Sequence, residues 1–189
     1  LVERTDALSH FNLDSTGRTV LVVGGSLGAR TVNQAVMAFA NTILQKKESL
    51  STPLRVIWQT GKYYYGQVTA DLARQYPGKY APGNFRLEGN GLTLLVRPFL
   101  ERMELAYPAA DLVVSRAGAI AISELCALGK PSILIPSPNV AEDHQTRNAR
   151  ALVKEGAAIL VTDAEAVEKL GSIISDTLEN NNLLESLGR

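Results

Sequence analysis

The chain has 189 residues, of which 46% are hydrophobic and 20% are charged, which is typical of one globular domain with a full apolar core. Its 19 basic and 19 acidic residues give a formal net charge of zero, which argues against nucleic acid as a partner because such proteins usually carry a basic excess. The longest apolar runs, such as Leu92–Val96, are far too short to span a bilayer. A single cysteine, Cys126, excludes a disulfide framework and favours a reducing compartment.

Short apolar runs alternate with amphipathic stretches of helical length along the chain. Leu1–Arg18 is polar and irregular, as expected of a linker, and Leu rather than Met at position 1 favours an excised domain or an incomplete gene product. The runs predicted as strands are Thr19–Val23, Leu54–Gln59, Leu92–Val96, Leu112–Ser115, Ser132–Ile135 and Ala158–Val161. The stretches predicted as helices are Thr31–Lys47, Tyr63–Tyr76, Glu101–Tyr107, Ala119–Leu128, His144–Glu155 and Ala164–Leu178. Pro77–Asn90, with its prolines and glycines, is predicted to be a loop.

This alternation favours βαβ units and therefore a parallel sheet that is covered by helices on both faces. We expect an α/β domain with a Rossmann-like sheet over residues 19–189. In open sheets of this kind, ligands bind beyond the carboxyl ends of the strands. The loops that follow the strands are therefore the candidate sites.

The loop Gly24–Arg30 follows the first strand and opens a helix. Its glycines let backbone N–H groups approach an anion at the helix N-terminus, and Ser26 adds a hydroxyl group. The alternative is a tight turn that needs glycine for its geometry alone. The spacing is that of neither a dinucleotide fingerprint nor a Walker A loop, and Gln59 ends the second strand where an NAD site would place an acidic residue. The loop therefore favours a phosphate site over an NAD site.

The segment Ser115–Glu124 leads from another strand through small residues into a helix. Glu124 lies away from the helical face that should pack on the sheet. A carboxylate can accept hydrogen bonds from two vicinal hydroxyls, which suits a ribose; the alternative is a solvated residue favoured by the helix dipole. This helix N-terminus is the second in the chain that suits a phosphate. Its presence beside Glu124 favours the role of ribose ligand over that of a solvated residue. The face expected to pack on the sheet carries Ala121, Ile122, Leu125 and Leu128.

The segment Pro136–Gln145 is a long polar loop between a strand and a helix. Asn139 or Asp143 in it is a candidate helix cap, the commonest role for such residues. Gln145 and His144 fall in the first helical turn, where side chains can reach the hydroxyls of a neutral sugar. We do not expect His144 to be a general base, because the sequence implies no carboxylate or nucleophile beside it.

The segment Arg97–Leu100 ends a strand and precedes a short helix that contains Met103. One interpretation is a rigid strand end with a buried Phe99. The other is a slot for a flat base that is read by backbone groups. The residues alone do not decide between the two.

Taken together, these segments resemble the MurG family, which transfers N-acetylglucosamine to the undecaprenyl-linked muramyl precursor of peptidoglycan. The resemblance covers essentially the whole chain, and its motifs keep their order and spacing. They are Arg4–Asp6, Gly24–Arg30, Trp58–Lys62, Pro98–Met103, Ala110–Ala119, Ser123–Glu124, Gly129–Pro131 and His144–Ala149.

The resemblance implies that the chain is the C-terminal half of a GT-B glycosyltransferase, the half that binds UDP-N-acetylglucosamine. It implies that Ser26 touches the diphosphate with Arg4 nearby, and that Leu100 holds uracil through its backbone. It implies that Glu124 binds the ribose hydroxyls and that Gln145 reads the sugar. The helix N-terminal amides implied to face the diphosphate and the sugar are those of Ala119, Ile120, Ala121, Ile122 and Ser123.

The acceptor site, the proposed catalytic base and the membrane-facing apolar patch of this family belong to an N-terminal half that the chain lacks. We therefore expect no catalytic residue, no metal and no cofactor here. The full-length protein is expected as a peripheral protein on the cytoplasmic face of the bacterial inner membrane, where it would convert lipid I to lipid II. Two alternatives stay open. One is a stand-alone donor-binding subunit of a split transferase, and the other is a UDP-sugar epimerase or NAD-binding Rossmann protein.

Overall fold

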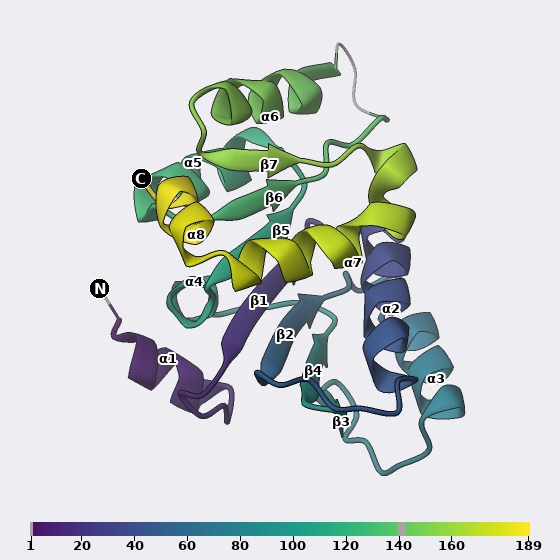
Figure 1. Ribbon diagram of the computed structural model, residues 1–189. Helices are drawn as coiled ribbons and strands as arrows, with labels where there is room; N and C mark the ends of the chain where they lie inside the picture. Colours follow the sequence, from purple (N-terminus) through teal and green to yellow (C-terminus); the bar gives the residue numbers. More distant parts are fainter. Residues whose placement is uncertain (1, 140–142) are drawn as a thin grey trace.

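The structure is a computed structural model that describes residues 2–139 and 143–189 (Figure 1). Its described strands form one sheet in the order β3-β4-β2-β1-β5-β6-β7. Neighbouring strands run parallel except for β3, which is antiparallel to β4. The strands are β1 (Arg18–Val23), β2 (Leu54–Gln59), β3 (Phe85–Gly89), β4 (Leu92–Arg97), β5 (Leu112–Ser115), β6 (Ser132–Leu134) and β7 (Ala158–Leu160).

Helices cover both faces of this sheet. Residues of α2, α3 and α7 join the apolar cluster on one face, and residues of α1, α4, α5 and α6 join the cluster on the other. The expected Rossmann-like architecture is therefore confirmed. The helices are α1 (Arg4–His10), α2 (Arg30–Leu44), α3 (Tyr65–Gln75), α4 (Met103–Ala109), α5 (Ala119–Leu128), α6 (His144–Lys154), α7 (Asp163–Glu179) and α8 (Asn181–Leu187).

The central strand β1 shows why the strands read as unbroken apolar runs. Val20 and Val22 belong to the cluster beneath α2 and α7, whereas Leu21 and Val23 belong to the cluster on the opposite face. Successive side chains of a strand point to opposite faces, so a strand covered on both faces needs apolar residues at every position. Each of these four residues is at most 7% exposed.

The prediction that Leu1–Arg18 is an irregular linker is wrong. Arg4–His10 forms α1, which packs on α4, and Ala7 and Leu8 of this helix are buried. Phe11 and Leu13 continue the same apolar surface after the helix ends. The four apolar side chains are too closely spaced to form a long amphipathic pattern, and polar residues lie between them. The sequence therefore did not indicate a helix.

The predicted loop Pro77–Asn90 contains the edge strand β3, so this prediction is also wrong in part. Phe85 and Leu87 of β3 are buried, and an Asn90-Gly91 turn with φ values of 52° and 80° joins the strand to β4. Asn-Gly is the preferred pair for a two-residue hairpin because both positions need a positive φ. The short helix α8 was likewise not expected; the side chain of Asn180 caps it by accepting the N–H of Leu183 at 3.0 Å.

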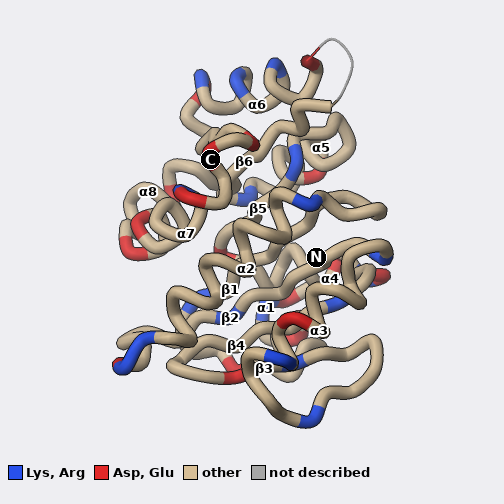
Figure 2. Tube along the Cα trace, turned by 90° about the vertical axis from the view of Figure 1, so that its right-hand side faces the viewer, with Lys and Arg blue, Asp and Glu red and all other residues tan. Residues whose placement is uncertain are grey.

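Positions of Lys and Arg and positions of Asp and Glu are distributed along the chain, and α6 carries several basic positions (Figure 2). None of the described helices is long and apolar enough to cross a membrane.

The order of the strands decides where a ligand can enter. The strand β1 lies between β2 and β5, so the loops after β1 and β5 lead to opposite sides and leave a crevice at the carboxyl ends of the strands.

Candidate functional site

A cavity of about 880 Å³ lies in this crevice. The loops after β1, β2, β4, β5 and β6 line it, together with the start of α7. Six residues that the sequence indicated lie in its wall, namely Ser26, Leu100, Ile120, Ala121, Glu124 and Gln145. The structure brings these six together, although they come from four different loops and helices.

Glycine serves two different purposes in the loop between β1 and α2. Gly28 has a φ of 85°, and a Cβ added there would lie 2.1 Å from the carbonyl oxygen of Thr60. Only glycine therefore lets the loop pack against the end of β2. Gly25 has a φ of 90°, but a Cβ on it would meet nothing within 4 Å. Gly25 lines the cavity, so its missing side chain leaves room for a ligand beside the backbone.

The helices α2 and α5 both begin at the cavity, and neither is capped by a side chain. The N-cap residues are Ala29 for α2 and Gly118 for α5, and neither makes a side-chain capping hydrogen bond. In α5 the N–H of Ile122 is bonded to the carbonyl oxygen of Gly118 at 3.0 Å, so only the N–H groups from Gly118 to Ala121 precede the helical ladder. Two uncapped N-termini beside one cavity favour an anion there.

The helical ladder narrows the set of amides that the sequence indicated. The amide of Ile122 is used inside α5, and neither Ile122 nor Ser123 lines the cavity. The Ser123 hydroxyl donates to the carbonyl oxygen of Ala119 at 2.9 Å. Ala119 itself is outside the cavity wall but contributes one of the N-terminal amides of α5.

The expected packing face of α5 is only partly formed. Leu125 is buried and Ala121 and Ile122 are half-buried, but Leu128 is 40% exposed.

A buried tyrosine holds the carboxylate of Glu124. Tyr107 of α4 is 4% exposed, and its hydroxyl donates to Oε2 of Glu124 at 2.7 Å. Burial, followed by the hydrogen bond and the negative charge of Glu124, raises the pKa of Tyr107 well above its usual value. The hydroxyl therefore stays protonated and keeps donating. Both residues line the cavity, and no sequence pattern indicated Tyr107, because the pair lies 17 positions apart on separate helices.

Gln59 at the end of β2 connects two of the loops. Its Nε2 donates to the carbonyl oxygen of Gly25 at 3.2 Å, and its Oε1 accepts the N–H of Leu100 at 2.8 Å. The N–H of Leu100 is therefore engaged within the protein. Phe99 is 41% exposed and lines the cavity, so the alternative of a buried Phe99 is wrong.

Gln145 joins the loops that follow β5 and β6. Its Oε1 accepts the N–H of Ser137 at 2.8 Å and that of Ala117 at 3.3 Å. The amide oxygen is thus engaged, and the Nε2 donor lies 3.9 Å from where a Cβ of Gly118 would be. Asp143 occupies the N-cap position of α6 with a φ of 55°, but its side chain makes no capping hydrogen bond. Residues 140–142 of the predicted loop Pro136–Gln145 lie outside the described residues.

An ion pair fixes the remaining wall of the cavity. Arg116 donates from Nη1 to Oδ1 of Asp163 at 2.6 Å and to the carbonyl oxygen of Ile135 at 3.2 Å. The other oxygen of Asp163 accepts the hydroxyl of Thr31 at 3.0 Å. These contacts connect the starts of α2 and α7 to the loop after β5. The sequence did not indicate a role for Arg116 or Asp163.

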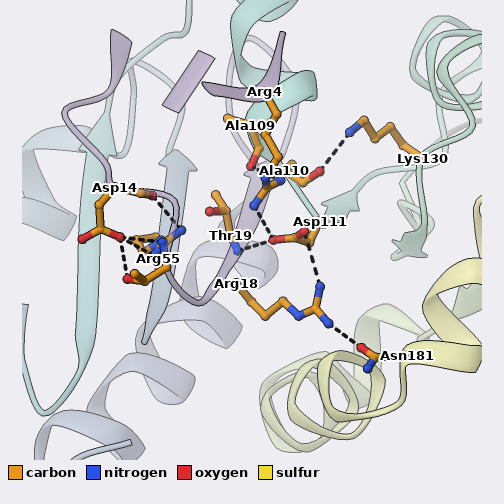
Figure 3. A network of polar contacts seen from close by, with 11 residues as sticks. Arg4, Asp14, Arg18, Thr19, Arg55, Ala109, Ala110, Asp111, Lys130 and Asn181 are labelled. Atoms are coloured by element: carbon orange, nitrogen blue, oxygen red, sulfur yellow. Dashed lines mark hydrogen bonds and ion pairs between the residues drawn. The ribbon is translucent and has the colours of Figure 1, made fainter. Parts of the chain in front are cut away.

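The structure does not bring Arg4 to the other site residues (Figure 3). Arg4 donates from Nη2 to Oδ2 of Asp111 and from Nη1 to the carbonyl oxygen of Ala109, both at 2.9 Å. Asp111 also accepts the N–H of Thr19 at 2.8 Å. Asp111 precedes β5 and Thr19 lies at the start of β1, so Arg4 is at the amino ends of the strands, whereas the cavity is at their carboxyl ends.

No group of three or more His, Cys, Asp or Glu side chains that could hold a metal ion is found in residues 2–139 and 143–189. At the end of β2, the neutral Gln59 takes the place of the carboxylate that an NAD-binding Rossmann site would use for a ribose. The carboxylate of this site, Glu124, comes from α5 instead.

The sheet, its flanking helices and the position of the cavity define the C-terminal domain of a GT-B glycosyltransferase. The chain belongs to the family described as Glycosyltransferase family 28 C-terminal domain, which matches residues 19–187.

Several known proteins are similar to the chain. It is 46% identical over 185 residues to the UDP-N-acetylglucosamine--N-acetylmuramyl-(pentapeptide) pyrophosphoryl-undecaprenol N-acetylglucosamine transferase of Bacteroides thetaiotaomicron, a match that covers 98% of this chain and 45% of that protein. The enzyme of the same name from Porphyromonas gingivalis strain W83 is 45% identical, with 97% and 45% covered. The crystal structure of Acinetobacter baumannii MurG matches with a TM-score of 0.71 at 31% identity, covering 91% of this chain and 46% of that one. The chain thus spans less than half the length of these relatives.

Proposed function

We propose that this chain is the donor-binding half of a transferase that moves N-acetylglucosamine from UDP-N-acetylglucosamine to an undecaprenyl-pyrophosphoryl-linked N-acetylmuramyl pentapeptide. The printed names of the relatives describe this reaction, and the family match covers residues 19–187. Since the chain spans less than half of these relatives, the acceptor site is assigned to the part of the protein outside it.

The observation that carries the proposal is the cavity wall itself, where two uncapped helix N-termini lie beside a carboxylate held by a buried tyrosine. The diphosphate fits the N-termini of α2 and α5, with the hydroxyl of Ser26 beside it. The ribose hydroxyls fit Glu124, because a carboxylate only accepts hydrogen bonds. Uracil would lie against Phe99 and the Leu100 backbone, and the sugar would reach the Nε2 donor of Gln145. Arg4 has no part in this assignment.

The same geometry explains how the donor half would assist transfer. When the bond between the sugar and the diphosphate breaks, negative charge develops on the leaving diphosphate. Backbone N–H groups and helix dipoles that are already oriented toward it stabilise this charge without reorganising. Activation of the acceptor hydroxyl falls to the other half. Because the named acceptor carries an undecaprenyl chain, the full-length protein would act as a peripheral protein at the cytoplasmic face of the inner membrane.

The test is calorimetric titration of the chain with UDP, UDP-N-acetylglucosamine, UDP-glucose and NAD. We expect UDP and UDP-N-acetylglucosamine to bind, UDP-glucose to bind more weakly than the latter, and NAD not to bind. Binding of NAD without binding of any uridine nucleotide would overturn the proposal in favour of a dinucleotide-binding protein. The chain alone should not transfer sugar to a lipid-linked muramyl acceptor, and measurable transfer would overturn the division of labour between the halves.

A further inference from the structure

We propose that Tyr107 is a positioning residue that aligns the Glu124 carboxylate for a vicinal diol, and so makes this site selective for ribonucleotides. This inference rests on the proposed function, which assigns the ribose to Glu124. It adds a residue whose side chain acts through Glu124 rather than through the ligand.

The two side chains differ in how firmly the protein holds them. Tyr107 is 4% exposed and belongs to the apolar cluster beneath α4, whereas Glu124 is exposed on α5. An exposed glutamate with three rotatable side-chain bonds would sample many rotamers, and a ligand that needs one of them would bear the entropy of fixing it. The hydrogen bond of 2.7 Å to a ring that cannot move selects one rotamer before the ligand arrives.

The same hydrogen bond determines which acceptor positions are left. An ionised carboxylate has about four lone-pair positions on its two oxygens. Tyr107 uses one of them on Oε2, which leaves Oε1 and the remaining position of Oε2 for two hydroxyls. The raised pKa of Tyr107 keeps its hydroxyl protonated, so it goes on donating to Glu124. A ligand with two adjacent hydroxyls can donate to both carboxylate oxygens at once, whereas a ligand with one hydroxyl cannot.

The experiment removes the hydroxyl and keeps the ring. Tyr107→Phe is titrated with UDP and with 2′,3′-dideoxy-UDP, in the otherwise unchanged chain and in a Glu124→Ala background. We expect Tyr107→Phe to weaken UDP binding roughly fivefold, which is in the range for ordering one flexible side chain on binding. The loss should vanish for the dideoxy ligand and also in the Glu124→Ala background. Tyr76→Phe is the matched control, because its hydroxyl donates to Asn41 at 2.8 Å without lining the cavity.

Each outcome decides one question. An equal loss for UDP and for dideoxy-UDP overturns the positioning role and shows that Tyr107 supports the shape of the cavity. An unchanged UDP affinity in Tyr107→Phe, in a chain where Glu124→Ala weakens UDP binding, overturns the positioning role and leaves the proposed function in place. Failure of the unmodified chain to bind UDP overturns both. Thermal midpoints of all variants report whether the fold is intact.

Discussion

The two ends of the parallel sheet place charged and polar groups in opposite ways. At the amino ends of the strands, Asp111 meets Arg4, Arg18 and the backbone N–H of Thr19, and Lys130 donates to a nearby carbonyl oxygen (Figure 3). Arg18 also reaches Asn181 of α8. These groups have their partners within the chain, and together they tie α1, β1 and α8 to the start of β5.

At the carboxyl ends, the partners within the chain are incomplete. The N-termini of α2 and α5 have no side-chain caps, and Glu124 receives a hydrogen bond from Tyr107 on one oxygen while its side chain is exposed. The comparison teaches that charge by itself does not mark a ligand site. Arg4 and Glu124 are both charged, and each is hydrogen-bonded to a residue distant in the chain. Only Glu124 lines the cavity, where its carboxylate can accept further hydrogen bonds from a ligand.

The largest effect should come from the loop between β1 and α2, in which one glycine serves packing and another lines the cavity. Gly28→Ala should lower the free energy of unfolding by about 3 kcal/mol or more, because a left-handed φ is strained for alanine and the methyl group would meet the Thr60 carbonyl. Gly25→Ala, the matched variant in the same loop, should cost only about 1–2 kcal/mol but should weaken UDP binding. Chemical denaturation and titration of both variants check this. Equal losses of stability would show that packing against Thr60 is not what requires Gly28.

Asp111→Ala should have the next largest effect, and on stability alone. It removes the acceptor shared by Arg4 and the N–H of Thr19, which should lower the free energy of unfolding by about 2 kcal/mol. UDP affinity should stay within about twofold, since the cluster lies at the opposite end of the sheet. Asp71→Ala, which breaks the exposed i,i+3 pair with Arg74, is the control and should cost less than about 1 kcal/mol. A tenfold loss of UDP affinity in Asp111→Ala would show that Arg4 and its cluster contribute to donor binding.

Glu124→Ala should show the converse pattern. The loss of a charged acceptor should reduce UDP affinity at least about tenfold. The thermal midpoint of the ligand-free chain should hardly change, because Glu124 is exposed and the Tyr107 hydroxyl lines the cavity, where water can replace the carboxylate as its acceptor. Glu168→Ala, an exposed position on α7 that does not line the cavity, is the control for a lost negative charge. A sharp fall of the midpoint together with an unchanged UDP affinity would make Glu124 a structural residue.

Local sequence signals were enough to predict the elements that the core defines. Six of the strands and their intervening helices follow from apolar runs such as that of β1. The glycine-rich loop after β1 predicted a turn into a helix. The prediction failed for α1, a seven-residue helix with only two apolar residues, Ala7 and Leu8, and for β3, whose glycine and proline neighbours indicated a loop. The helix α1 packs on α4, which is distant in the chain, whereas β3 pairs with the strand that follows it, across an Asn90-Gly91 turn whose local signal the prediction overlooked.

The partners of the site residues could not be predicted, for a different reason. Tyr107 and Glu124 lie on separate helices, and Arg116 pairs with Asp163 across 47 positions. No periodic pattern relates such pairs, because the fold alone brings them together. A motif therefore indicated which loops carry the ligand, whereas the residues that hold those loops in place became visible only in three dimensions.

The smallest effect that we predict concerns Gln145. The comparison of the two ends of the sheet is sharpest here, because this one side chain both has partners within the chain and faces the cavity. Its Oε1 is fully used in joining the N–H groups of Ser137 and Ala117, as in a structural cluster, while its Nε2 donor faces the start of α5. Gln145→Ala should therefore weaken UDP binding about threefold, since the loop before α5 loses one support of roughly 0.5–1 kcal/mol. UDP-N-acetylglucosamine should lose more, because the sugar also loses its donor, and the advantage over its galacto epimer should narrow. Titration of the unmodified and variant chains with the three ligands measures this. Equal losses for all three would leave Gln145 with the structural role only, and selection of the sugar would then have to come from elsewhere in the cavity.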